Sequence, residues 1–193
     1  ACSQERDPWL RPFDKESIWN MPIGDSAVYK DANMKAAYAV TFDFVHIMKL
    51  DANDPLKPVY GQLNMWRDRC GEDMKYQGYK LNIPDGFYVE PDNPDGGKYG
   101  HTPNSTFAFL KTNGKHLIQG QVLARCDPYG PVYYPKWVDL NSNELIFGDG
   151  LNSTDAHGHG ASGMNALGGT IRVGELSGDD SIRHALKLCI YAK

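Results

Sequence analysis

Hydrophobic and polar residues alternate over short stretches of this chain, and residues 39–50, AVTFDFVHIMKL, show the clearest pattern. Val40, Phe42 and Phe44 fall on one face of that stretch, which is typical of a half-buried strand. Similar runs predict further short strands at 58–63, 79–83, 86–89, 105–110, 115–122, 131–134, 137–140, 144–147, 169–173 and 185–191.

Helical patterns are short and few. One helix is expected over 31–38, with Asp31 as its N-cap, and one helical turn within 179–184. Asn113-Gly114 predicts a hairpin with a type I′ turn, which needs positive φ at both central residues. We therefore expect an all-β fold: a single-domain β-sandwich or jelly roll over residues 1–193, with long Pro/Gly-rich loops and one or two short helices.

The first thirty residues have no regular period and are rich in proline and aromatic residues. Because they lack a strand or helix pattern, we expect this segment to wrap around the domain. Trp9, Phe13 and Trp19 would then insert their rings into its core.

Charge and hydropathy exclude two classes of partner. The formal net charge is −4, and no run of Lys or Arg is present to neutralise phosphates, so nucleic acid is not expected as a partner. The chain also lacks an apolar run of about 18 residues, so no membrane span is expected.

Four widely spaced cysteines, Cys2, Cys70, Cys126 and Cys189, form no CxxC pair. Their even number predicts two disulfides and an oxidising compartment, although four buried free thiols remain an alternative. Three pairings are possible, and we favour Cys2–Cys189 with Cys70–Cys126 because chain ends often lie close together.

Two further features favour an extracellular, secreted protein. Asn104 and Asn152 each begin an Asn-Ser-Thr glycosylation sequon in polar surroundings. The sequence also begins at Ala1 rather than Met, as it would after removal of a signal peptide.

Residues 148–175 hold eight of the twenty glycines, which indicates turns or close backbone approach. His157 and His159 would share one face of a strand, so with Asp155 they are candidate ligands of a metal ion. No metal or other cofactor is required by the sequence. The alternative is a surface loop whose histidines are solvated or bonded locally.

A second group with possible chemistry comprises Arg172, Glu175 and His184. His157 or His184 would act as general acid or base, Glu175 would be its carboxylate partner, and Arg172 would bind substrate. The alternative is an Arg172–Glu175 ion pair, with His184 capping a backbone carbonyl.

Aromatic residues gather in the segment CDPYGPVYYPKW. Sugar rings stack on exposed aromatic faces, so this segment supplies candidates for glycan contact, with core packing as the alternative. The candidates are Tyr129, Tyr133, Tyr134 and Trp137.

Both ends of the chain carry recognisable motifs. The start, PFDKESIWNMPIG, resembles a WN-x-PIG pattern, and the end resembles an HG-x-SG…LGGTIR-GEL…IRHAL pattern. Together they resemble secreted microbial and algal proteins, largely uncharacterised and jelly-roll-like. The resemblance implies secretion, a β fold and a polysaccharide-rich setting, and it implies no catalytic residues.

Two hypotheses of function follow. The first is a secreted, disulfide-stabilised glycoprotein domain that acts by assembly or glycan contact in an extracellular matrix or fibre. Its partners would be polysaccharide, covalently attached glycans or further copies of itself. The second is a polysaccharide-cleaving enzyme, a hydrolase or a lyase, with its site in residues 148–175.

Overall fold

The computed structural model describes residues 7–9, 11–22, 24–31, 33, 45–66, 68–91, 104–138, 146–151, 158–159, 163–171, 174–177, 182 and 184–188. Within these ranges all regular structure is β, so the expected all-β class is confirmed. The strands are β1 (Val45–Lys49), β2 (Leu56–Gly61), β3 (Lys75–Asn82), β4 (Thr106–Leu110), β5 (Leu117–Gly120) and β6 (Val132–Tyr133).

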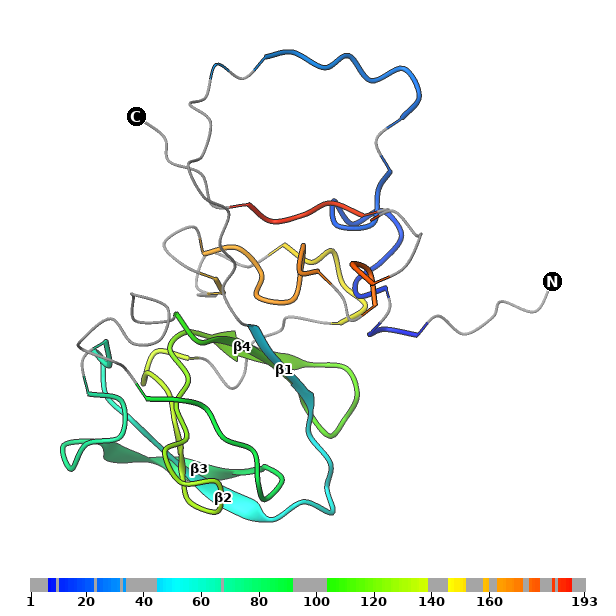
Figure 1. Cartoon of the computed structure of the whole chain (residues 1–193). Coiled ribbons are helices and arrows are strands. Elements are labelled where there is room, and N and C mark those ends of the chain that lie inside the picture. The colour runs from blue at the N-terminus through cyan, green and yellow to red at the C-terminus, as the bar shows by residue number, and fades with distance from the viewer. Residues whose placement is uncertain are drawn as a thin grey trace.

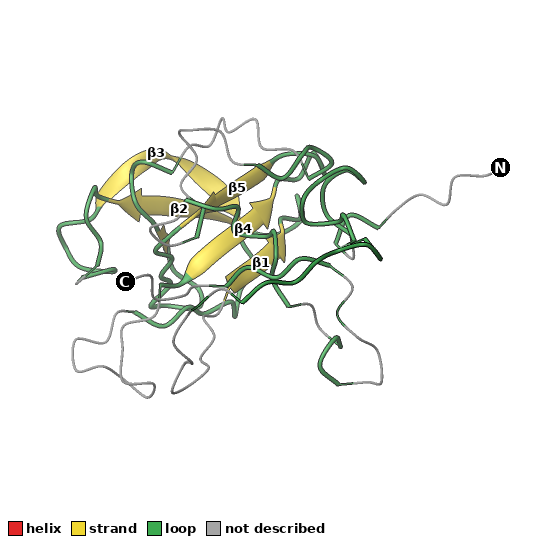
Figure 2. Cartoon of the chain, turned by 90° about the horizontal axis from the view of Figure 1, so that it is seen from above, coloured by secondary structure: helices red, strands yellow, loops and turns green. Residues whose placement is uncertain are grey.

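The six strands form two three-stranded sheets, with the orders β1-β4-β5 and β3-β2-β6. Each sheet combines one antiparallel pair with one parallel pair, β1–β4 in the first sheet and β2–β6 in the second. Parallel neighbours were not expected, because a jelly roll consists of antiparallel strands. Figure 2 shows the strands gathered in the centre, with loops around them.

Strand β4 is the centre of the packing, and all five of its residues are buried. Phe107 and Phe109 point into a core shared with the second sheet. Ala108 and Leu110 project from the opposite face, as alternation along a strand requires, and enter a second core. One sheet therefore separates two hydrophobic cores, which accounts for the uninterrupted apolar run FAFL.

The second core is closed by irregular segments from both ends of the chain. Its buried members include Phe13 and Trp19 from the first segment, with Ile146, Ala166 and Leu167 from the last. In Figure 1 the blue N-terminal segment and the yellow-to-red C-terminal segment lie on the same side of the β1–β4 sheet, opposite β2 and β3. Phe13 and Trp19 are buried in this core as expected and Trp9 packs against it, whereas residues 24–30 of the same segment are exposed.

The hairpin predicted at Asn113-Gly114 joins β4 to β5, but its turn is not type I′. Only Gly114 of the two residues has a positive φ, at 67°. The Gly114 N–H donates to the Lys111 carbonyl, and the Lys111 N–H donates to the His116 carbonyl. The loop is therefore longer than two residues, and only one left-handed position is needed.

Several strand predictions are wrong where they fall on described residues. Residues 86–89 form only an isolated bridge between Val89 and Arg125. Residues 137–138, 146–147, 169–171 and 185–188 are turns or irregular. Gly169 has a φ of 71°, which is incompatible with a strand. Most of both predicted helices, and residues 39–44, lie outside the described residues.

Candidate functional site

Three glycines of the 148–175 stretch, Gly150, Gly168 and Gly169, form a close-packed seat for Trp19. A Cβ atom added to Gly168 would lie 2.5 Å from the Trp19 ring, and one added to Gly150 or Gly169 would lie 2.7 Å from it. The Trp19 Nε1–H also donates to the Gly150 carbonyl at 2.8 Å. These glycines allow an indole to pack against backbone, so their role is structural.

The two end motifs meet in this seat. The Phe13 N–H donates to the Ile146 carbonyl at 2.5 Å, and the Asp14 N–H donates to the Gly148 carbonyl at 2.7 Å. The Asn20 side chain donates to the carbonyls of Pro12 and Asp14 and closes the turn that presents Trp19. The motif residues at the start of the chain therefore bind segments near its end.

Glu175 and His184 come together as the acid–base hypothesis requires. His184 Nε2 lies 2.8 Å from Glu175 Oε1 and 3.0 Å from Oε2, and Nδ1 lies 2.9 Å from the Ala185 carbonyl oxygen. Both ring nitrogens therefore face oxygen atoms, the Glu175 carboxylate on one side and the Ala185 carbonyl on the other. His157 and Arg172, the other predicted members of this group, lie outside the described residues.

Lys187 lies beside this pair along the chain and is largely buried. Its Nζ donates to the carbonyls of Asn165 and Ala166 at 2.7 and 3.2 Å. Burial lowers the pKa of the Lys187 ammonium to about 8. The carbonyl contacts orient the amine, and desolvation penalises its charged form.

The free energy of unfolding should depend on pH through the titration of Lys187. Between pH 8 and 10.5 the unfolded chain holds a proton that folded Lys187 has released, so unfolding becomes harder as pH rises. Relative to Lys187→Met, the free energy of unfolding of the wild type should rise by about 1–3 kcal/mol from pH 7 to 10. Denaturant titrations at several pH values measure it. A difference between the two proteins that does not change with pH would contradict the burial of this charge.

The metal hypothesis receives no support from the described part of the chain, where no group of three or more His, Cys, Asp or Glu side chains is placed to hold an ion. His159 is half-buried, and its backbone N–H donates to the Met164 carbonyl at 2.6 Å. Asp155 and His157 lie outside the described residues.

The Cys70–Cys126 disulfide is present, as expected. Cys2 and Cys189 lie outside the described residues, and so does the sequon residue Asn152. Asn104 is half-buried at the edge of β4, and the next two residues of its sequon, Ser105 and Thr106, are buried. This sequon therefore leads directly into a core strand instead of lying in a polar loop.

Of the four aromatic residues predicted to contact glycans, Tyr134 is fully buried in the core between the sheets. That prediction is wrong for Tyr134, because its ring presents no face to solvent and its hydroxyl bonds that of Tyr79 at 2.9 Å. Trp137 is half-buried and packs on the same core. Tyr133 is half-buried, and Tyr129 is 65% exposed.

Tyr133 belongs to a different aromatic group, in which three tyrosines lie side by side across the second sheet. Tyr60 on β2 is paired with Tyr76 on β3 and with Tyr133 on β6. The ring centroids are 5.6 Å apart for Tyr60–Tyr76 and 5.9 Å apart for Tyr60–Tyr133. We call Tyr76, Tyr60 and Tyr133 the tyrosine strip.

The tyrosine strip is on the sheet face that points away from the shared core. Val59 and Val132, the preceding residues on β2 and β6, point into that core, so alternation directs Tyr60 and Tyr133 outward. Tyr60 and Tyr133 pack on a small cluster of Met65, Met74 and Val122, and Tyr76 is 49% exposed at the sheet edge. Tyr60 and Tyr133 are therefore half-buried against that cluster, and Tyr76 is the exposed member of the strip.

An irregularity in β3 creates this alignment. Pro58 pairs with Lys80, yet Tyr60 pairs with Tyr76, so β3 carries two extra residues at that point. Gly78, within the irregularity, has a φ of 88°. The Gln77 amide donates to the carbonyls of Gly61 and Lys75 and holds the displaced backbone. Bulges of this kind redirect side chains, and here the shift brings Tyr76 beside Tyr60.

Partial burial affects the strip's chemistry. It raises the pKa of the Tyr133 phenol, and the neighbouring Tyr60 and Asp127 add to that effect. The hydroxyl therefore stays protonated well into the alkaline range and remains a hydrogen-bond donor as well as an acceptor.

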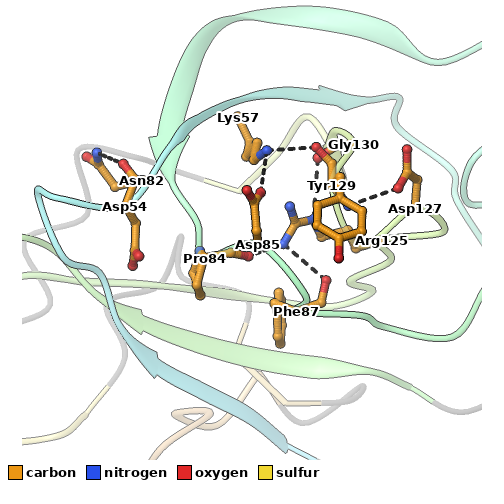
Figure 3. Close-up of polar contacts among 10 residues, drawn as sticks. All are labelled: Asp54, Lys57, Asn82, Pro84, Asp85, Phe87, Arg125, Asp127, Tyr129 and Gly130. Atoms are coloured by element: carbon orange, nitrogen blue, oxygen red, sulfur yellow. Dashed lines mark hydrogen bonds and ion pairs between the residues drawn. The ribbon is translucent and has the colours of Figure 1, made fainter.

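Tyr129 lies apart from the strip, on a turn built around Arg125 (Figure 3). The buried Arg125 guanidinium donates to the carbonyls of Pro84, Phe87 and Gly130. Lys57 Nζ donates to the Tyr129 carbonyl at 2.7 Å and forms an ion pair with Asp85 Oδ1 at 2.6 Å, so it links the same turns. Tyr129 is therefore an exposed ring on a rigid turn, with no aromatic neighbour among the described residues.

Comparison with known proteins adds no further assignment, since no protein-family model, curated protein or solved structure matches this chain. The resemblance of the two end motifs stays a prediction. Among the described residues, no helix is long and apolar enough to cross a membrane.

Sequence reasoning missed Tyr60 and Tyr76. Each occurs in a predicted or near-predicted strand, LKPVYG or KYQGYKLN. By alternation Tyr76 shares its face of β3 with Lys80, whereas Tyr60 shares its face of β2 with Leu56. The available signal was therefore the polar face around Tyr76, and no such signal marked Tyr60. Their adjacency was hidden by the two-residue irregularity in β3.

Proposed function

We propose that this protein is an extracellular, disulfide-stabilised β-domain that binds glycans through the tyrosine strip. The observation that carries the proposal is the alignment of Tyr76, Tyr60 and Tyr133 at one register of the second sheet. Pyranose rings present apolar C–H faces, which pack on aromatic rings, while phenol hydroxyls bond the sugar's hydroxyl groups.

The form of the strip indicates the form of the ligand. Successive ring planes are inclined by 52° and 36°, so the three ring faces are not coplanar and do not make a flat surface. A single flexible glycan chain can contact rings that are inclined to one another, whereas the flat face of a crystalline polysaccharide cannot. The proposal therefore concerns single chains of a matrix or fibre polysaccharide, or glycans attached to a neighbouring protein.

Other features are consistent with an extracellular setting. The Cys70–Cys126 bond suits an oxidising compartment, and the two sequons suit the secretory route. Secretion, glycosylation and a role in a matrix or fibre are parts of the proposal.

Replacing Tyr76 tests the proposal. Tyr76→Ala should weaken binding to the glycans that the wild type retains on a glycan array by about tenfold, a loss of about 1.4 kcal/mol. Tyr88 is a matched control, since it is 52% exposed against 49% for Tyr76 and lies outside the strip. Equal affinity of wild type and Tyr76→Ala, or an equal loss in Tyr88→Ala, would contradict the strip's role.

A polysaccharide-cleaving enzyme is the second candidate, and the Glu175–His184 pair is the observation that favours it. On that hypothesis His184→Ala and Glu175→Gln would each lower turnover of a polysaccharide substrate by at least about 100-fold, the scale of general acid–base catalysis. Turnover that survives both substitutions would exclude this pair as the catalytic group.

A further inference from the structure

The loop that follows β2 contains a second aromatic feature. Gln62, Asn64, Trp66 and Asp68 line an open cavity of about 400 Å³. Its position is set by the second sheet: Gln62 directly follows β2, and its carbonyl accepts the Lys136 N–H just beyond β6. The cavity therefore lies at the same ends of β2 and β6 as Tyr60 and Tyr133.

Trp66 is exposed but held in place. Trp66 is 45% exposed, while Met65 and Arg69, which flank it in the sequence, are buried. The Arg69 guanidinium lies 5.9 Å from the Trp66 ring centroid, within cation–π range, and Arg69 Nη1 donates to Ser105 Oγ at the start of β4. The next residue, Cys70, is bonded to Cys126. An exposed ring on an anchored loop costs little entropy on binding.

Three polar side chains accompany the ring. Asn64 Oδ1 accepts the Trp66 N–H at 3.2 Å, which leaves its amide hydrogens for a ligand. Gln62 offers a second amide, and Asp68 offers a carboxylate. One aromatic face with two amides and a carboxylate matches a ring that has an apolar face and a rim of hydroxyl groups.

The carboxylate of Asp68 is positioned by Gly71. A Cβ atom added at Gly71 would lie 1.9 Å from Asp68 Oδ2, so the carboxylate occupies the space that a side chain at position 71 would fill. A negative charge in the wall of the cavity accepts hydrogen bonds from sugar hydroxyls and repels a uronate or sulfate group.

We infer that the Trp66 cavity, in the loop that directly follows Tyr60 and β2, is a binding site for an uncharged sugar ring. The inference rests on the proposed function, because it assigns a sugar class to the same glycan-binding surface. The cavity lies near the lower end of the about 300–1,000 Å³ typical of small-molecule sites, a size for one or two sugar rings.

Calorimetric titration with soluble oligosaccharides tests the inference. The probes are neutral gluco-, manno-, galacto- and xylo-oligosaccharides, with uronic-acid and sulfated oligosaccharides as the charged comparison. Trp66→Ala should weaken binding of the neutral ligand at least about tenfold. Leu63→Ala, at a 73% exposed apolar residue of the same loop, should leave it unchanged. Asp68→Asn should raise the affinity for uronic-acid ligands relative to neutral ones.

Three outcomes would overturn the inference. If Trp66→Ala binds neutral ligands as the wild type does while Tyr76→Ala is weakened, the cavity assignment fails and the proposed function stands. If the wild type binds only charged ligands, the assigned sugar class is wrong. If the wild type binds no oligosaccharide on calorimetry or on the array, both the cavity assignment and the proposed function fail.

Discussion

Replacing Trp19 with alanine is expected to lower the free energy of unfolding by about 3–5 kcal/mol, the usual cost of removing a buried tryptophan. Trp19 is 6% exposed and packs in the core formed with Phe13, Leu110 and Leu167. Its Nε1–H bond to Gly150 joins residues 131 positions apart. Urea denaturation of the purified protein measures the loss, and Trp66→Ala, at an exposed tryptophan, should cost much less.

The glycine seat gives a second test of the same packing. Gly168→Ala places a Cβ atom 2.5 Å from the Trp19 ring, so it should cost about 1–3 kcal/mol by overpacking. Gly24→Ala is the matched control, because a Cβ atom added there meets nothing within 4 Å. Equal melting temperatures for the two variants would contradict the account of the glycine-rich stretch as a seat for Trp19.

Replacing Arg125 with methionine is expected to destabilise the fold by about 3–5 kcal/mol. Its buried guanidinium bonds three backbone carbonyls, at Pro84, Phe87 and Gly130, which would lose their donors (Figure 3). Burial lowers the pKa of Arg125, while Asp85 and Asp127 act in the opposite direction. The residue therefore stabilises the fold only because these acceptors surround it.

Lys57→Met is the control for Arg125→Met. It removes a cation from the same group of turns, but one whose partner Asp85 is half-exposed, so its loss should cost about 1 kcal/mol or less. Thermal unfolding of the two variants under one buffer compares them. A melting temperature of Arg125→Met equal to that of Lys57→Met would show that the carbonyl contacts contribute little.

Local patterns predicted the centre of the fold well. The run TFAFL followed by Asn113-Gly114 predicts β4 and its hairpin, because a fully apolar strand and a turn residue are both local signals. The all-β class follows from the same patterns. The pairing of strands could not be predicted from local patterns, since the parallel β1–β4 and β2–β6 pairs join segments far apart in sequence.

The C-terminal segment shows where local patterns mislead. Residues 169–173 and 185–191 have the apolar content of strands, yet Gly169 is left-handed and packs against Trp19 and Lys187. A single hydrogen bond, from the Lys187 N–H to the Gly169 carbonyl, joins the two described segments. The left-handed Gly169 allows the close contact with Trp19, a residue far away in sequence. Local sequence propensities cannot predict such a contact.

The candidate site was predicted only in part. The sequence analysis paired Glu175 with His184 and Cys70 with Cys126 as hypotheses. The structure places both pairs together. Glycan contact was predicted for one aromatic segment, from which Tyr133 alone belongs to the strip. Tyr60 and Tyr76 depend on cross-strand register, which a two-residue irregularity sets and which short-range alternation does not encode.

The tyrosine ring signals of the protein, observed by NMR during titration with an oligosaccharide retained on the glycan array, test the central claim most directly. The account predicts that Tyr76, Tyr60 and Tyr133 shift together, while exposed Tyr88 and buried Tyr134 stay unchanged. Shifts at Tyr129 or Tyr88 with the strip unchanged would contradict it, because the ligand would then occupy another face of the protein.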